Sequence, residues 1–115
     1  MGYKKLKVYQ KSYKLAVSIY RYVTESMPKS EQYELSSQMR RASTSIPLNI
    51  AEGYGKQESR AEFKRYLMMA RGSCNEMGVL LDICRDVGYM CEEHHSKYSV
   101  RYEEVSKMLS GLLKS

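Results

Sequence analysis

Cations repeat at helical spacing near the amino terminus, and the chemistry of such a row is phosphate binding. Its steps alternate between three and four residues, which places its members on one face of an α-helix. The row consists of Lys4, Lys7, Lys11, Lys14, Ser18 and Arg21. Exposed lysines neutralise a nucleic-acid backbone without reading base edges, so this basic ridge is a candidate for sequence-independent contact with RNA or DNA. The alternative is an ordinary solvated helix face, but such faces usually interleave acids with bases.

The net charge supports the first interpretation. Residues 1–29 carry seven lysines and arginines against the single acid Glu25, which gives +6, and the whole chain also sums to +6. A basic excess confined to one element suggests a surface that faces a polyanion. We expect Lys64, Arg65 and Arg71 to extend this surface if their helix lies beside the first.

A pair of arginines flanks apolar positions farther along the chain. We expect at least one of Arg40 and Arg41 to be partly buried and paired with a carboxylate such as Glu52 or Glu76. Contact with nucleic acid is the alternative role for this pair. Asn49 falls on an apolar stripe, where a polar residue often fixes register or assembly.

Three patterns superficially resemble catalytic or metal sites. Gly53-Tyr-Gly55-Lys56 lacks the spacing of a phosphate-binding loop, and Ser26-Met-Pro-Lys29 runs out of a helix through proline. Cys91 and His95 share a helix face, but zinc needs four converging ligands, and His94 points to a neighbouring face. We therefore expect a protein that is not an enzyme and holds no metal or cofactor.

Four stretches of apolar residues with a period near 3.5 must position these side chains. Joined by short turns, they predict an all-α protein, an antiparallel up-down-up-down four-helix bundle that forms one domain over residues 1–115. The helices are expected over residues 6–27, from Ser30 to about Gly53 and Gly55, from Ser59 to just before Gly88, and over residues 91–112.

Capping residues mark three of these helix ends. Ser30 is the expected N-cap of the second helix. Ser59 and Glu62 form a capping box at the start of the third helix, and Gly88 is placed as the residue after its C-cap.

Tyrosines occupy much of the expected core stripe. In the first helix this stripe is Leu6, Tyr9, Tyr13, Ala16, Tyr20, Val23 and Met27, and in the fourth it includes Tyr98 and Tyr102. The basic ridge is displaced from it by two residues, or about 200°, so we expect it almost opposite the core. A buried phenol needs a hydrogen-bond partner. These tyrosines therefore either lie at the edges of the stripe with hydroxyls in solvent or contact another subunit.

The stripe of the second helix runs straight through a proline. Leu35, Met39, Ala42, Ile46, Asn49 and Gly53 keep the helical spacing around Pro47. Proline has no N–H for the Ser43 carbonyl, so we expect a kink at Pro47. The side chains of Ser43, Thr44, Ser45 or Asn49 are the expected replacement donors.

Four motifs in register carry a resemblance to a known family. They are Leu6-Lys-Val-Tyr-Gln-Lys, the arginine pair with Ser45-Ile-Pro-Leu-Asn-Ile-Ala-Glu-Gly, Ala70-Arg-Gly-Ser-Cys-Asn-Glu, and Lys107-Met-Leu-Ser-Gly-Leu. The chain resembles the bacterial four-helix-bundle proteins encoded in intervening sequences of 23S ribosomal RNA genes, a family related to the accessory variability determinant of diversity-generating retroelements. The resemblance implies a symmetric homo-oligomer, most simply a pentamer, without an established enzymatic activity. The retroelement relatives bind a reverse transcriptase and nucleic acid.

Cysteine usage and hydropathy bear on the compartment. Cys74, Cys84 and Cys91 are odd in number and form no Cys-x-x-Cys pair, which fits a reducing cytoplasm. No apolar run approaches the roughly 20 residues of a membrane span, and no stretch resembles a signal peptide. We expect a cytoplasmic, oligomeric accessory or scaffold protein that binds nucleic acid and a nucleic-acid enzyme such as a reverse transcriptase. The alternative is an assembly module that engages a polymerase or ribosomal component through protein contacts alone.

Overall fold

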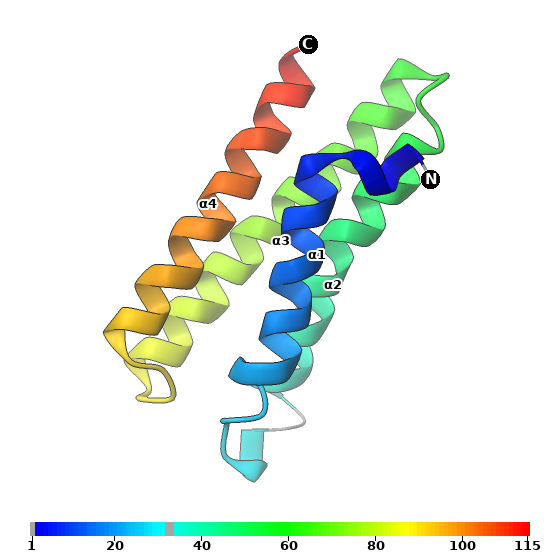
Figure 1. Ribbon diagram of the computed structural model, residues 1–115. Coiled ribbons are helices and arrows are strands. Elements are labelled where there is room, and N and C mark those ends of the chain that lie inside the picture. Colours follow the sequence, from blue (N-terminus) through cyan, green and yellow to red (C-terminus); the bar gives the residue numbers. More distant parts are fainter. Residues whose placement is uncertain (1, 32–33) are drawn as a thin grey trace.

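Four α-helices run alternately up and down in the computed structural model, which describes residues 2–31 and 34–115. They are α1 (Lys7–Ser18), α2 (Leu35–Tyr54), α3 (Arg60–Asp86) and α4 (Glu92–Lys114), as Figure 1 shows. The regular elements within the described ranges are all helical, which confirms the predicted all-α class. None of these helices combines the length and the apolar character needed to cross a membrane.

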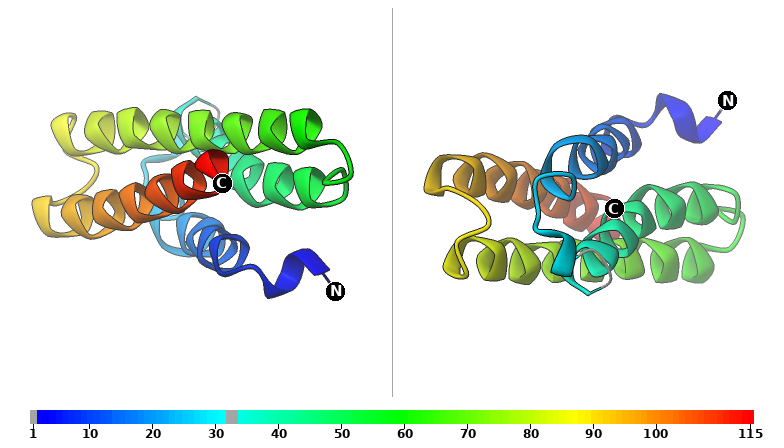
Figure 2. Two further views of the ribbon diagram at one scale, coloured as in Figure 1. Left: turned by 90° about the horizontal axis from the view of Figure 1, so that it is seen from above. Right: turned by 90° about the horizontal axis from the view of Figure 1, so that it is seen from below.

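Each helix packs against two neighbours, so the four helices form a closed bundle. Helix α1 packs against α2 and α4, and α3 packs against the same two helices from the opposite side. Figure 2 shows α1 and α3 on opposite sides of the rod, which measures 45 × 22 × 20 Å. The two sides of α1 therefore meet different neighbours.

The predicted core stripes of α3 and α4 agree with the structure. In α3 the stripe consists of Phe63, Leu67, Ala70, Cys74, Met77, Leu81 and Cys84, and all of these residues are buried. In α4 the stripe positions His95, Tyr98, Tyr102, Val105 and Leu109 are buried as well, and Leu112 is partly buried. Cys91 is exposed because it is the N-cap of α4. In α2 Ile50 is fully buried, whereas its neighbour Asn49, the predicted stripe position, is only partly buried.

The predicted core stripe of the first helix is wrong by one residue at its tyrosine positions, where the structure buries Val8, Ser12 and Ile19. The predicted positions Ala16, Val23 and Met27 are buried as expected, and Leu15 is buried beside them. Tyr13 and Tyr20 remain 52% and 44% exposed, because a neighbouring register buries apolar side chains without burying their phenols. One residue corresponds to about 100° on a helix, so the basic ridge lies about 100° to one side of the core, and the tyrosines lie about 100° to the other.

The connection between α1 and α2 also differs from the prediction. Helix α1 continues as a π-helical turn, Ile19–Val23, in which the Thr24 N–H donates to the Ile19 carbonyl at 3.0 Å. Ser30 lies in a short 3₁₀ helix, Lys29–Glu31, instead of capping α2. Helix α2 begins only after Glu34, whose backbone angles (φ −98°, ψ −85°) depart from helical values. Residues 32 and 33, which we expected in its first turn, lie outside the described residues.

The predicted ends of α3 are confirmed, with one change. The Ser59 hydroxyl accepts the Glu62 N–H at 3.3 Å, but the Ser59 N–H donates to the Lys56 carbonyl, and the Glu62 carboxylate pairs with Arg65 at 3.1 Å. At the other end, Gly88 has φ of +88°, the left-handed region that favours glycine. The Gly88 and Tyr89 N–H groups close a Schellman motif on the Arg85 and Cys84 carbonyls.

Helix α2 continues through Pro47, which is buried. The expected replacement donors do not turn to the Ser43 carbonyl. The hydroxyls of Ser43 and Thr44 donate to the Arg40 carbonyl, that of Ser45 to Ala42, and the Asn49 amide to Ser45 at 2.8 Å. That part of the prediction is wrong, and the kink itself stays a prediction.

Candidate nucleic-acid interface

A polar groove of about 290 Å³ lies between α1 and α4. Three cations, Lys11, Lys14 and Arg101, line it together with one acid, Glu104. The Lys11 ammonium lies 3.3 Å from the Glu104 carboxylate, and both side chains are about half exposed. We call this hollow the basic groove.

The helical period explains how these residues converge. On α1 each ridge residue directly precedes a core residue, so the ridge faces the α4 side of the bundle. On α4, Lys97, Arg101 and Glu104 follow at steps of four and three, which gives them one common face. The Ser18 and Tyr98 hydroxyls join the two helices with a 2.6 Å hydrogen bond beneath this face.

The electrostatics of the basic groove favour an anionic ligand. Lys7 extends the ridge on α1 beyond the groove and is exposed, whereas Arg21 lies in the π-helical turn and lines a different groove, toward α2. The Lys11–Glu104 pair is solvent-exposed, and such pairs contribute only about 0–1 kcal/mol. Lys11 can therefore exchange this partner for a phosphate at small cost.

The structure divides the predicted nucleic-acid residues between two sides of the molecule. Lys4 is exposed in the 3₁₀ helix Gly2–Lys5, next to the ridge of α1. The condition for an extension on α3 is not met, because α3 lies diagonally across the bundle from α1. There Arg65 pairs with Glu62 and covers the Tyr66 ring, and Arg71 donates to Ser110; Lys64 lies on the same helix.

The extension that the structure does contain is on α4. Sequence reasoning missed Lys97 and Arg101, although their spacing with Glu104 was visible. In a closed four-helix bundle with short turns, the fourth helix lies beside the first. This rule could have placed Lys97 and Arg101 next to the ridge from the sequence alone.

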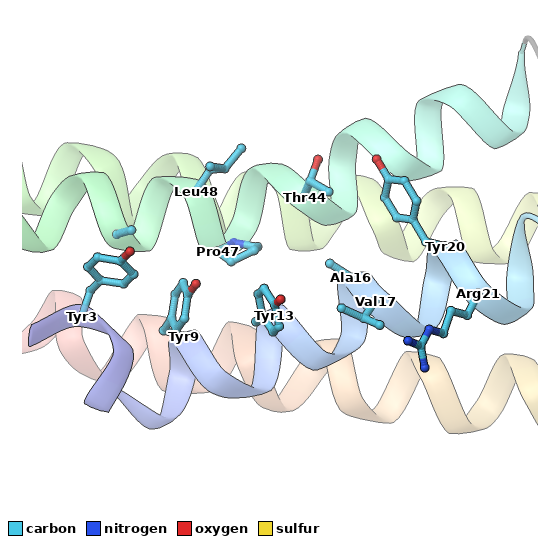
Figure 3. Close-up of a pocket in the computed structure, with 11 residues that line it drawn as sticks. Tyr3, Tyr9, Tyr13, Ala16, Val17, Tyr20, Arg21, Thr44, Pro47 and Leu48 are labelled. Atoms are coloured by element: carbon cyan, nitrogen blue, oxygen red, sulfur yellow. The ribbon is translucent and has the colours of Figure 1, made fainter. Parts of the chain in front are cut away.

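A second groove, of about 540 Å³, lies between α1 and α2 and is mostly apolar, with four tyrosines in its lining. Tyr3, Tyr9 and Tyr13 follow one another along it, with Tyr20 farther on, and Pro47 and Leu48 form the α2 wall (Figure 3). The rings of Tyr3 and Tyr9 meet edge to face at 5.0 Å, and those of Tyr9 and Tyr13 stack at 5.9 Å. Burial, and secondarily the nearby Tyr3 and Tyr13 phenols, raise the pKa of Tyr9. We call this the tyrosine groove.

The arginine pair is held without the expected carboxylates. Arg40 donates to the Thr24 hydroxyl at 3.2 Å, and its guanidinium lies 5.4 Å from the centre of the Tyr20 ring. Arg41 is exposed. Within the described part of the chain, neither arginine forms an ion pair with Glu52, which is exposed, or with Glu76.

Tyr98, Tyr102 and Gly53 lie inside the bundle. Tyr98 is buried and bonded to Ser18. Tyr102 is also buried, and among the residues described its hydroxyl has no hydrogen-bond partner. Burial, together with the neighbouring Cys74 and Tyr98, raises the pKa of Tyr102. A Cβ on Gly53 would come within 3.0 Å of the Tyr66 Cβ, so this glycine lets α2 approach α3.

Cys91 and His95, which share a helix face in the sequence, have different environments in the structure. His95 is buried, with its Nε2 2.7 Å from the Asp82 carboxylate, whereas Cys91 is exposed at the N-cap of α4. Over residues 2–31 and 34–115, no three His, Cys, Asp or Glu side chains are grouped to hold a metal ion.

The fold places the protein in the class of all-α four-helix bundles. Comparison with known proteins identifies the family. The family model of 23S rRNA-intervening sequence proteins matches residues 4–111, so the chain belongs to that family. It is also similar to the crystal structure of a protein of unknown function from the S23 ribosomal protein family of Bacteroides thetaiotaomicron. The two are 29% identical with a TM-score of 0.85, over 94% of this chain and 99% of the other. Comparison with curated proteins gives no match.

Proposed function

We propose that this protein is a non-enzymatic, oligomeric accessory or scaffold protein that binds nucleic acid through phosphate contacts in the basic groove. One observation carries the proposal: three cations from two helices converge on one groove that holds a single exposed carboxylate. The family's name connects its members with 23S rRNA, which makes RNA the first ligand to test.

The groove chemistry fits a phosphate backbone. Arg101 can bind a phosphate through two parallel N–H donors, and Lys11 and Lys14 act as point charges beside it. These contacts position a strand without reading its bases, so unrelated sequences should bind alike.

Assembly is the second part of the proposal. The tyrosine groove exposes Tyr13 and Leu48, the latter 67% exposed, and an apolar patch of this kind is typical of a protein contact. A second copy of the chain is the proposed occupant, and the family resemblance favours a pentamer. Five chains of +6 would carry 5 × 6, or +30, and would repeat the basic groove around the ring.

We propose a nucleic-acid enzyme as a further partner of this ring. The resemblance to a retroelement accessory protein makes a reverse transcriptase the partner to test, and the cytoplasm is the proposed compartment. Co-purification with any reverse transcriptase encoded beside the gene would test this part.

Fluorescence anisotropy with unrelated RNA and DNA oligomers, from about 50 to 200 mM salt, tests the central claim. Replacing Lys14 and Arg101 together with alanine should weaken binding for every sequence and reduce the log–log salt slope by about 0.7 for each lost single-strand contact. The matched control, Lys56→Ala with Lys107→Ala, removes the same charge from exposed positions outside the groove. An equal loss in both variants, or no binding by the wild type at low salt, would contradict the proposal.

The tyrosine groove favours a second candidate, an assembly module that works through protein contacts alone. It would be preferred if the protein assembles normally but binds no RNA or DNA at low salt.

A further inference from the structure

An aromatic hollow lies near the basic groove, at the end of the bundle where α3 turns into α4. This hollow measures about 430 Å³, and its walls include Tyr22 from the π-helical turn, Tyr89 from the turn between α3 and α4, and His94, Lys97 and Tyr98 from the start of α4. Its volume falls in the range of about 300–1,000 Å³ typical of ligand sites. We call it the end hollow.

The two hollows are neighbours with a shared wall. Ser18 lines the basic groove and Tyr98 lines the end hollow, and their hydroxyls are hydrogen-bonded at 2.6 Å. Lys97 covers the Tyr98 ring with its ammonium 5.8 Å from the ring centre, one helical turn before Arg101. Cations therefore continue from one hollow into the other.

Tyr22 is the unusual member of this wall. Its side chain is 66% exposed, the most of any tyrosine among the exposed large hydrophobic residues. It lines the same hollow as Lys97. An exposed ring beside a row of cations is the combination that proteins use to bind single-stranded nucleic acid, with bases stacked on the ring and phosphates on the cations.

We propose that the site selects single strands over duplexes. The phosphates lie on Lys11, Lys14 and Arg101, and one unstacked base enters the end hollow and stacks on Tyr22. This inference rests on the proposed function and specifies its ligand. A duplex has its bases already stacked and paired, so it can contact the cations but cannot fill the hollow.

The experiment compares four labelled probes of about 12 residues: single-stranded RNA, single-stranded DNA, an abasic strand and a blunt DNA duplex. Tyr22→Ala should weaken binding of both base-bearing single strands about 5- to 100-fold and leave the abasic strand and the duplex unchanged. Tyr22→Phe keeps the ring and should bind like the wild type. Tyr66→Ala, which removes a partly buried ring from α3, is the matched control and should change none of the four.

The outcomes separate the two proposals. If the wild type binds none of the probes, the proposed function itself fails. If it binds all four equally, and Lys14→Ala with Arg101→Ala weakens them all, the phosphate site stands and the single-strand inference is overturned. A loss in Tyr22→Ala that includes the abasic strand would also overturn it, because stacking cannot act on a strand without bases. Native mass spectrometry of each variant verifies that assembly is unchanged.

Discussion

The two sides of α1 are built from the same repeat and have opposite chemistry. Val8 lies between Lys7 and Tyr9, and Ser12 lies between Lys11 and Tyr13. Because the core residues recur at steps of three and four, the residues before them line one side of the helix and the residues after them line the other. A single amphipathic pattern thus produces a cationic side toward α4 and an aromatic side toward α2.

The neighbouring helices determine what each side can do. Toward α4, the ridge meets polar partners such as Glu104 and Tyr98, and exposed ion pairs there can be exchanged for phosphates. Toward α2, the tyrosines meet Pro47 and Leu48, and the gain comes from removing apolar area from water. We therefore expect ligand binding on the side toward α4 to weaken as the salt concentration rises. Association through the side toward α2 should weaken when apolar area is removed.

The largest expected effect comes from charging the aromatic side. Tyr13→Asp with Leu48→Asp should dissociate the proposed oligomer while leaving the fold intact, because both side chains are largely exposed in the single chain. Nucleic-acid affinity should then fall about 10²- to 10⁴-fold, since linked binding sites are lost. Native mass spectrometry and anisotropy measure the two effects.

The control for this variant introduces the same charges on other helices. Val79 and Val100 are also exposed, and replacing both with aspartate should leave assembly unchanged. If the Tyr13 and Leu48 variant remains fully assembled, the tyrosine groove is not the subunit contact.

A smaller effect tests how the cationic side is anchored to α4. Tyr98→Phe removes the hydroxyl bonded to Ser18 and should lower the free energy of unfolding by about 0.5–1.5 kcal/mol. Tyr102→Phe is the matched control, because it removes a buried hydroxyl without a partner in the described structure and should be neutral or stabilising. Urea denaturation of both variants measures the difference, and equal destabilisation would show that the Ser18–Tyr98 bond contributes nothing specific.

A third change should strengthen nucleic-acid binding. Glu104→Gln frees Lys11 from its ion pair and removes the one carboxylate of the basic groove, so affinity should rise about two- to fivefold. Glu103→Gln removes the same charge from the adjacent residue, which lines the opposite α3–α4 side of the helix. The expected result in anisotropy is a clear rise for Glu104→Gln and a smaller one for Glu103→Gln. Equal gains would mean that only net charge matters.

The sequence predicted α3 and α4 well because their apolar stripes have no competing register. Helix α1 offered two registers, one with three tyrosines and one with Val8, Leu15 and Ile19. When tyrosine is counted as an apolar residue, the register with three tyrosines is favoured, and this is not the register that the structure buries. The cost of burying a phenol without a partner was the physical reason to prefer the other.

The candidate site was only half visible in the sequence. The ridge on α1 followed from local spacing, but its continuation on α4 depends on which helices are neighbours in space. The start of α2 was predicted incorrectly for another reason. Glu34 has backbone angles outside the helical region, so α2 begins only at Leu35, and no local sequence signal predicts this conformation.

The smallest expected effect is a difference in alkaline stability that singles out the tyrosine groove. The pKa of Tyr9 is raised above its ordinary value of 10.0, first by burial and then by Tyr3 and Tyr13. A group whose pKa is raised by folding contributes stability that is fully present below its unfolded pKa and is lost as the pH rises through its folded pKa. The Tyr9→Phe variant has no phenol to ionise at this position. Its melting temperature should therefore rise relative to that of the wild type as the pH passes above 10, with little difference at pH 7. Tyr22→Phe, which removes an exposed phenol outside the groove, is the control. If wild type and Tyr9→Phe lose stability in parallel, the aromatic side of α1 is as open to water as the cationic side, and the contrast between them rests on charge alone.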